Sequence, residues 1–133
     1  MAFQLPVRIY WEDTDAGGIV FYANYLKFFE RARTEWLRSL GINQRDLRER
    51  TGGMFVVSET SVRYLQPARL DDELLVTAEL QEAGRASMVI AQQALLRPGD
   101  AVLATGSIRI GWVEAATLRP ARIPANILEA LNQ

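Results

Sequence analysis

EDTDAGGIVFYANY, residues 12–25, carries three carboxylates into a pair of glycines and then into a helical pattern. Gly17 and Gly18 permit the tight or left-handed backbone of a sharp turn, and the first N–H groups of a helix have no partner within it. The stretch therefore brings an acidic side chain close to free N–H donors, an arrangement that can bind and polarise a carbonyl group. A purely structural interpretation is also open, in which Asp15 or Asn24 caps the helix.

The chain contains neither histidine nor cysteine among its 133 residues. Most nucleophilic hydrolases pair serine or cysteine with histidine, and most catalytic zinc sites take at least one His or Cys ligand. These classes are excluded, and we predict no metal site. Any hydrolytic chemistry would depend on a carboxylate acting as a base or a nucleophile.

Length and charge limit the remaining classes. The length predicts a single domain over residues 1–133. A formal net charge of −1 gives no electrostatic reason to expect nucleic acid or an anionic membrane as a partner. The N-terminal residues lack a signal-peptide pattern, and no apolar run is long enough to cross a membrane. We expect a cytoplasmic protein without membrane insertion.

The glycine turn is followed by a long helix, predicted over residues 23–40 and ended by Gly41. Its apolar stripe consists of Tyr25, Phe28, Phe29, Ala32, Trp36, Leu37 and Leu40. A stripe of this width indicates a helix that packs on a core. A strand is predicted before the acidic stretch, at residues 7–11, and residues 42–53 are expected to connect the helix to a sheet, with room for a short second helix.

The second half of the chain predicts an antiparallel sheet and a short C-terminal helix. Strands are expected at residues 54–65, 73–83, 86–96 and 101–113, and the helix at residues 124–131. Leu74, Val76, Ala78 and Leu80 share one face, and Thr77, Glu79 and Gln81 share the other, which is typical of a sheet with one covered face. The fold class is therefore α+β, with one long helix against the sheet and an open edge available to another subunit.

Three segments resemble the hotdog-fold acyl-CoA thioesterases: YWEDTDAGGIVFYANY at residues 10–25, FERARTE at residues 29–35 and PARLDD at residues 67–72. The similarity is to the 4-hydroxybenzoyl-CoA thioesterase family, and within it to the Tol–Pal-associated branch. It implies a hotdog fold, in which a five-stranded antiparallel sheet wraps one long central helix. It also implies hydrolysis of an acyl-CoA to a free acid and CoA, with coenzyme A as part of the substrate and no other cofactor.

The resemblance assigns roles to individual residues. Asp15 is implied to be the catalytic carboxylate, which either attacks the thioester carbonyl or activates water. The backbone N–H of Tyr22 is implied to polarise that carbonyl, while Gly18 and Val20 belong to the same motif and Tyr25 is expected to line the substrate site. The hydroxybenzoyl-CoA enzymes tend to carry tyrosine at the position of Tyr22, whereas Tol–Pal-associated members commonly carry histidine.

Three further residues are weaker candidates. Another hotdog branch uses a glutamate from a different element, so Glu59 is a second candidate carboxylate, with an outward-facing strand residue as the alternative interpretation. Ser61 on the same face is a candidate for the pocket lining. Arg85, at a predicted hairpin tip, is a candidate for binding the phosphates of coenzyme A.

The resemblance also implies a homodimer with its site at the subunit interface, commonly doubled to a homotetramer. A hotdog dehydratase or hydratase would need an acid–base pair that typically includes histidine, which this chain lacks. The remaining alternative is a non-catalytic protein that binds acyl-CoA or acyl-carrier protein, or acts as a scaffold for lipid enzymes.

Overall fold

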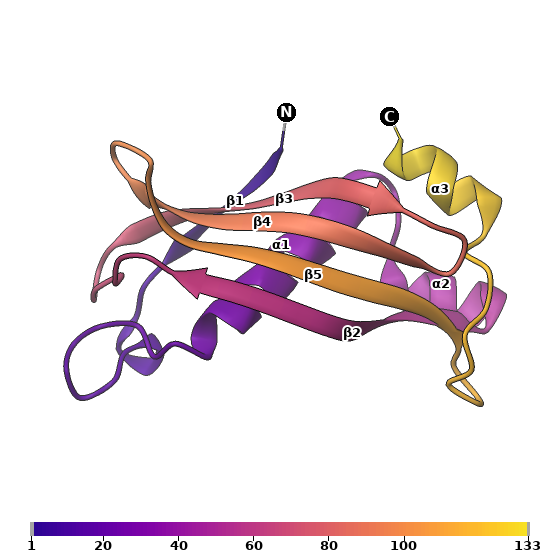
Figure 1. The fold of residues 1–133 in the computed structure, drawn as a ribbon, viewed down its shortest axis with the longest axis horizontal. Coiled ribbons are helices and arrows are strands. Elements are labelled where there is room, and N and C mark those ends of the chain that lie inside the picture. The colour runs from indigo at the N-terminus through magenta and orange to yellow at the C-terminus, as the bar shows by residue number, and fades with distance from the viewer. Residues whose placement is uncertain (1, 133) are drawn as a thin grey trace.

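The computed structural model describes residues 2–132, which form one five-stranded antiparallel sheet with a long helix against one face (Figure 1). The strands lie in the order β1-β3-β4-β5-β2. The elements are β1 (Phe3–Arg8), a 3-10 turn (Trp11–Asp13), α1 (Asn24–Ser39), α2 (Gln44–Thr51), β2 (Gly53–Tyr64), β3 (Glu73–Ala83), β4 (Ser87–Arg97), β5 (Ala101–Glu114) and α3 (Ala125–Leu131). This architecture confirms the predicted α+β fold with a long helix on an antiparallel sheet.

The core lies between α1 and the sheet. Leu74, Val76 and Ala78 of β3 are fully buried, as their alternation predicts. The buried residues of α1 are Tyr25, Phe28, Phe29, Ala32, Trp36 and Leu37, which is the predicted stripe without Leu40. The helix ends within one residue of the predicted position, and Gly41 follows in the left-handed region, with φ at +82°.

The helix covers only part of the sheet. It packs mainly against β1, β3 and β4, and it has fewer contacts with β5 and with β2, the strand at the other edge. Side chains that face this uncovered region are exposed although they are apolar, among them Leu26 of α1 and Val57 and Tyr64 of β2. The β2 edge of the sheet therefore has unpaired backbone groups and exposed apolar side chains beside it.

The strand β2 contains a bulge at Ser58. Val57 pairs with Ile110 and Glu59 pairs with Arg109, so Ser58 is an extra residue. Because side chains alternate along a strand, one extra residue exchanges the two faces beyond it. Phe55 and Val57 before the bulge thus share the helix-facing side with Thr60, Val62 and Tyr64 after it.

The N-terminal strand differs from its predicted position at residues 7–11. β1 runs from Phe3 to Arg8, and Trp11 lies in the 3-10 turn. The predicted bounds were wrong. The strand includes Pro6, whose missing N–H is tolerated because β1 lies at the edge of the sheet and pairs with β3. The short helix allowed for in residues 42–53 is confirmed as α2, whose first N–H groups are capped by the side chain of Asn43.

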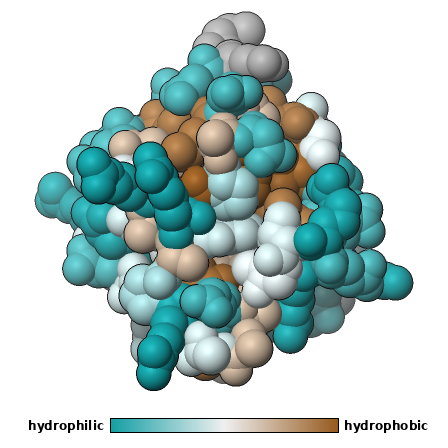
Figure 2. Space-filling model, turned by 90° about the vertical axis from the view of Figure 1, so that its right-hand side faces the viewer, coloured by the Kyte–Doolittle hydropathy of each residue, from teal (hydrophilic) through white to brown (hydrophobic). Residues whose placement is uncertain are grey.

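Within residues 2–132, no helix combines the length and the apolar character needed to span a bilayer. The end of the molecule at which α2, α3 and the β3–β4 hairpin lie is largely hydrophilic, with apolar surface between the polar groups (Figure 2). The acidic stretch lies at the opposite end of the sheet (Figure 1).

Candidate active site

The acidic stretch folds into a narrow hydrogen-bonded loop before α1. The N–H of Asp15 donates to the carbonyl of Ile19 at 2.8 Å, and the N–H of Phe21 donates to the carbonyl of Asp13 at 3.0 Å. Gly18 closes the tip with φ at +79°, a conformation that favours glycine. The loop is therefore held by its own backbone, and its two arms lie side by side.

The carboxylate of Asp15 is exposed at the tip of this loop. Its Oδ1 accepts a hydrogen bond of 2.8 Å from the N–H of Gly17, which orients the side chain. This is the only bond to the carboxylate among residues 2–132, so Oδ2 stays available. An oriented, exposed carboxylate with a free oxygen can act as a base or a nucleophile.

The start of α1 has no side-chain cap. Ala23 is the N-cap residue, and neither Asp15 nor Asn24 accepts a bond from the first turn, so the capping interpretation of these two residues is wrong. Asn24 instead donates from Nδ2 to the carbonyl of Asp13 at 2.9 Å, which ties the acidic loop to the helix. In the described part of the chain, the N–H of Tyr22 donates to no acceptor. This N–H is free to polarise a carbonyl oxygen.

A pocket of about 290 Å³, which we call the tyrosine pocket, lies between the loop, the start of α1 and the end of β2. It is lined by Ile19, Val20, Tyr22, Tyr25, Tyr64, Leu65, Gln66 and Pro67. Three of the predicted substrate-site residues, Val20, Tyr22 and Tyr25, thus come together. Asp15 and Gly18 lie in the adjoining loop rather than in the pocket wall.

The hydroxyl groups of two tyrosines connect the segments around this pocket by hydrogen bonds. Tyr64 donates to the carbonyl of Tyr22 at 2.9 Å, and the hydroxyl of Tyr25 accepts from the N–H of Ala68 at 3.3 Å. Burial raises the pKa of Tyr64, and the neighbouring Tyr22 adds to the shift. Burial also raises the pKa of Tyr25. Both hydroxyls therefore keep their protons at neutral pH, and Tyr64 remains a hydrogen-bond donor.

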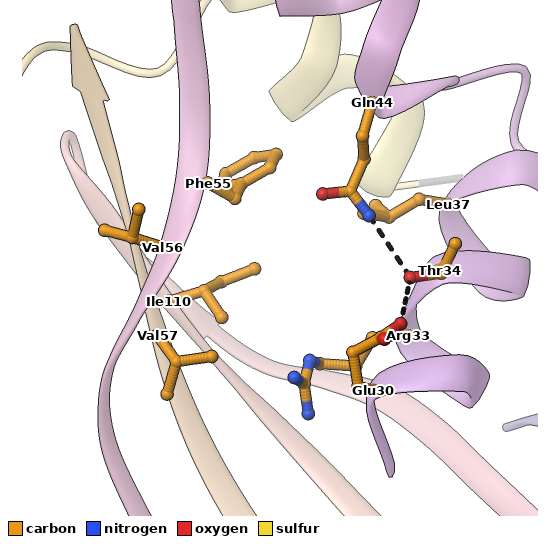
Figure 3. Close-up of a pocket in the computed structure, with 9 residues that line it drawn as sticks. All are labelled: Glu30, Arg33, Thr34, Leu37, Gln44, Phe55, Val56, Val57 and Ile110. Atoms are coloured by element: carbon orange, nitrogen blue, oxygen red, sulfur yellow. Dashed lines mark hydrogen bonds between the residues drawn. The ribbon is translucent and has the colours of Figure 1, made fainter. Parts of the chain in front are cut away.

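A second pocket, which we call the helix–strand pocket, lies between α1, α2 and the start of β2 and has a volume of about 340 Å³ (Figure 3). Phe55 and Ile110 make its sheet side apolar. Its helix side is mostly polar and consists of Glu30, Arg33, Thr34 and Gln44, together with Leu37. The polar groups are connected, because Gln44 donates to Thr34 at 3.3 Å and Thr34 donates to Glu30 at 2.7 Å.

Arg33 is the most buried charge of the helix–strand pocket. Its Nη1 donates to Oε1 of the buried Gln92 at 2.9 Å, and Gln92 in turn donates to the carbonyls of Phe29 and Thr77. Burial lowers the pKa of the Arg33 guanidinium, and the Glu30 carboxylate opposes this shift. The pocket thus offers an apolar wall facing a fixed polar wall.

The remaining predicted residues lie away from the loop. Glu59 and Ser61 pair with Arg109 and Ser107, on the side of the sheet opposite α1. Arg85 lies in the β3–β4 hairpin. This hairpin and the acidic stretch lie at opposite ends of the sheet (Figure 1). Within one chain these three side chains are not brought together with Asp15.

Sequence reasoning missed Tyr64 and the polar wall around Arg33. The signal for Tyr64 is an aromatic residue at the end of a strand, but its direction depends on the bulge at Ser58. Arg33 sits beside the apolar stripe of α1 and resembles any solvated helix residue until the buried Gln92 is placed against it.

The sequence model of the thioesterase-like superfamily matches residues 9–131. The chain belongs to this superfamily. It is 38% identical to the acyl-CoA thioesterase YbgC of Haemophilus influenzae, over 98% of this chain and 94% of the relative. It is also 38% identical to the acyl-CoA thioester hydrolase YbgC of Escherichia coli, over 98% of this chain and 96% of the relative. These similarities confirm the predicted resemblance to acyl-CoA thioesterases and the predicted class of enzyme, a thioester hydrolase.

The fold is shared with more distant thioesterases. The crystal structure of a 1,4-dihydroxy-2-naphthoyl-CoA thioesterase from Synechocystis superimposes with a TM-score of 0.92 and covers 100% of this chain and 97% of its own, at 19% identity. This likeness confirms the predicted hotdog fold. The association with the Tol–Pal system stays a prediction.

Proposed function

We propose that this thioesterase hydrolyses the thioester of an acyl-CoA, with Asp15 as the catalytic carboxylate and the N–H of Tyr22 as the donor to the thioester carbonyl. One observation carries this proposal. The oriented carboxylate and the unpartnered N–H belong to one loop, whose arms are joined by the bonds from Asp15 to Ile19 and from Phe21 to Asp13.

The chemistry follows from these two groups. When the thioester carbonyl oxygen accepts a hydrogen bond from the Tyr22 N–H, the carbonyl carbon becomes more electrophilic. The same donor stabilises the oxyanion that forms on attack. Two routes are open for Asp15. It attacks the carbonyl carbon and expels the CoA thiolate, leaving an anhydride that water hydrolyses, or it removes a proton from a water molecule that attacks instead. Both routes yield a free acid and CoA.

We further propose that the enzyme works as a homodimer joined along β2, doubled to a tetramer. The open edge of β2 and the exposed apolar groups of Leu26, Val57 and Tyr64 support pairing with a second copy. A two-fold axis through antiparallel β2 strands would bring the tyrosine pocket of one subunit beside the helix–strand pocket of its partner. The acyl group would then extend between the two subunits.

The experiment that tests the function is steady-state hydrolysis of a panel of acyl-CoAs, from short aliphatic through aromatic to long-chain, followed by release of the thiol. We expect turnover with at least one class. The mixed apolar and polar walls of the helix–strand pocket are expected to discriminate between acyl groups. Binding without turnover of any thioester would contradict the proposal and favour the alternative of a non-catalytic acyl-binding or scaffold protein.

Asn24 is expected to contribute to the rate through the position of the acidic loop. Asn24→Ala removes the bond from Nδ2 to the Asp13 carbonyl. The expected result is a fall in kcat of roughly fivefold and a loss of about 1 kcal/mol in the free energy of unfolding. Thiol-release kinetics and urea denaturation measure the two effects.

The matched control is Asn43→Ala, which removes the cap of α2. It should cost about 1 kcal/mol of stability as well, but kcat should stay within about twofold of the unsubstituted enzyme because α2 does not hold the loop. An equal fall in kcat for both variants would mean that the rate follows stability and that Asn24 has no specific role.

The cytoplasmic location, a role for acyl-carrier protein and the phosphate-binding role of Arg85 stay predictions.

A further inference from the structure

The start of α1 is held through the carbonyl oxygens of Phe21 and Tyr22 rather than by a side-chain cap. At most helix starts a side-chain oxygen accepts from the N–H groups of the first turn. Here no side chain does so; the N–H of Asn24 donates to the carbonyl of Phe21 at 2.9 Å, and Tyr64 donates to the carbonyl of Tyr22 at 2.9 Å. These bonds involve the Asn24 N–H and the carbonyl oxygens of Phe21 and Tyr22, so they fix the backbone without occupying the Tyr22 N–H.

We propose that Tyr64 is a positioning residue that orients Tyr22 so that its N–H meets the thioester carbonyl. The inference rests on the proposed function, because it assigns Tyr64 a part in the same step. Tyr64 itself need not touch the reacting atoms.

The geometry of the two peptide planes supports this role. The Tyr22 N–H and the Phe21 carbonyl share one plane, which the bond from Asn24 holds. The Tyr22 carbonyl belongs to the next plane, which the hydroxyl of Tyr64 holds. The two planes meet at the Cα of Tyr22, so both bonds are needed to fix the backbone on either side of this residue. Removal of the bond from the Tyr64 hydroxyl frees the peptide plane that contains the Tyr22 carbonyl.

Tyr64 is attached to a rigid element. It is the last residue of β2 and pairs with Ala104 of β5. Its ring lies edge-on to Tyr25, with centroids 5.5 Å apart, and edge-on to Tyr22 at 6.1 Å. Aromatic contacts of this kind restrict the ring. The hydroxyl therefore reaches the Tyr22 carbonyl from a fixed position, which is the requirement for a group that sets geometry to within a fraction of an ångström.

The test is Tyr64→Phe, which keeps the ring and its contacts and removes only the hydroxyl. We expect kcat to fall about tenfold on the preferred acyl-CoA, while KM stays within about twofold. A role limited to folding or to the pocket wall would lower the melting temperature or raise KM without this selective loss of kcat. Thermal unfolding is measured in parallel and is expected to change little.

Two further variants make the result specific. Tyr10→Phe removes an exposed hydroxyl outside the tyrosine pocket and is expected to leave both constants unchanged. Tyr64→Leu removes the ring as well, and we expect the same fall in kcat together with a raised KM. If Tyr64→Leu unfolds the enzyme, the kcat and KM of Tyr64→Phe alone test the positioning role.

The possible outcomes separate the two proposals. Wild-type turnover with an unchanged kcat in Tyr64→Phe would overturn the positioning role and leave the thioesterase function intact. A rise in KM alone would also overturn it. Absence of wild-type turnover on every thioester would overturn the proposed function, and the positioning role with it.

Discussion

Replacing Asp15 by asparagine is expected to lower kcat by about three orders of magnitude, the middle of the range for loss of a general acid–base group. Asparagine has the same shape, and its Oδ1 can still accept the bond from the Gly17 N–H that shapes the loop. The variant therefore loses the negative charge and the basic oxygen but not the fold. Thiol release on the preferred acyl-CoA measures the rate, and binding of the same substrate by calorimetry should change little.

Asp13→Asn is the matched control, because it removes one charge from the same loop. The Oδ2 of Asp13 accepts from the N–H of Tyr10 at 2.8 Å and serves the turn. Its replacement should cost less than tenfold in kcat. Comparable losses in the two variants would attribute the effect to the net charge of the loop, and an active Asp15→Asn enzyme would exclude Asp15 as the catalytic carboxylate.

The second large effect concerns stability. Gly53→Ala is expected to lower the free energy of unfolding by about 3 kcal/mol, because the added methyl group would overlap the indole ring of Trp112. That ring is buried and lies edge-on to Phe55, with centroids 4.9 Å apart, so it has little room to move. Denaturant unfolding of the two proteins measures the difference.

Gly111→Ala makes the same chemical change on the neighbouring strand, three pairs of residues away from Gly53 in the ladder. Its added Cβ would lie 3.8 Å from the carbonyl of Ala86, an ordinary contact. The cost should stay below about 1 kcal/mol. A loss of similar size in both variants would mean that glycine is needed for strand geometry rather than for the space that Trp112 occupies.

Periodicity and turn residues were sufficient to predict most of the fold. The stripe of α1 and the alternation in β3 each report burial directly, since a residue's face follows from its position in a regular element. The N-terminal strand was misplaced because the strand-forming residues continue through Trp11, and local pattern does not show that β1 contains Pro6 and lies at an edge of the sheet.

The candidate site was predictable where its residues are neighbours in the chain. Asp15, Val20, Tyr22 and Tyr25 lie on one loop and the helix that follows it, so a local motif contains their relation. Tyr64 reaches the same place from a strand 42 positions later, through a bond that no local pattern encodes. The fixed orientation of Arg33 likewise depends on Gln92, 59 positions away.

The bulge at Ser58 affects how a change in the length of β2 among related sequences should be interpreted. Ser58 has no partner in the ladder, so deleting it would join Val57 to Glu59 and leave every later pair in place, with Thr60, Val62 and Tyr64 still facing the helix. Such a deletion would remove no catalytic side chain and would keep the bond from Tyr64 to the carbonyl of Tyr22. When related chains are aligned, a gap of one residue at this position is therefore compatible with an intact site, whereas a substitution of Asp15 is not.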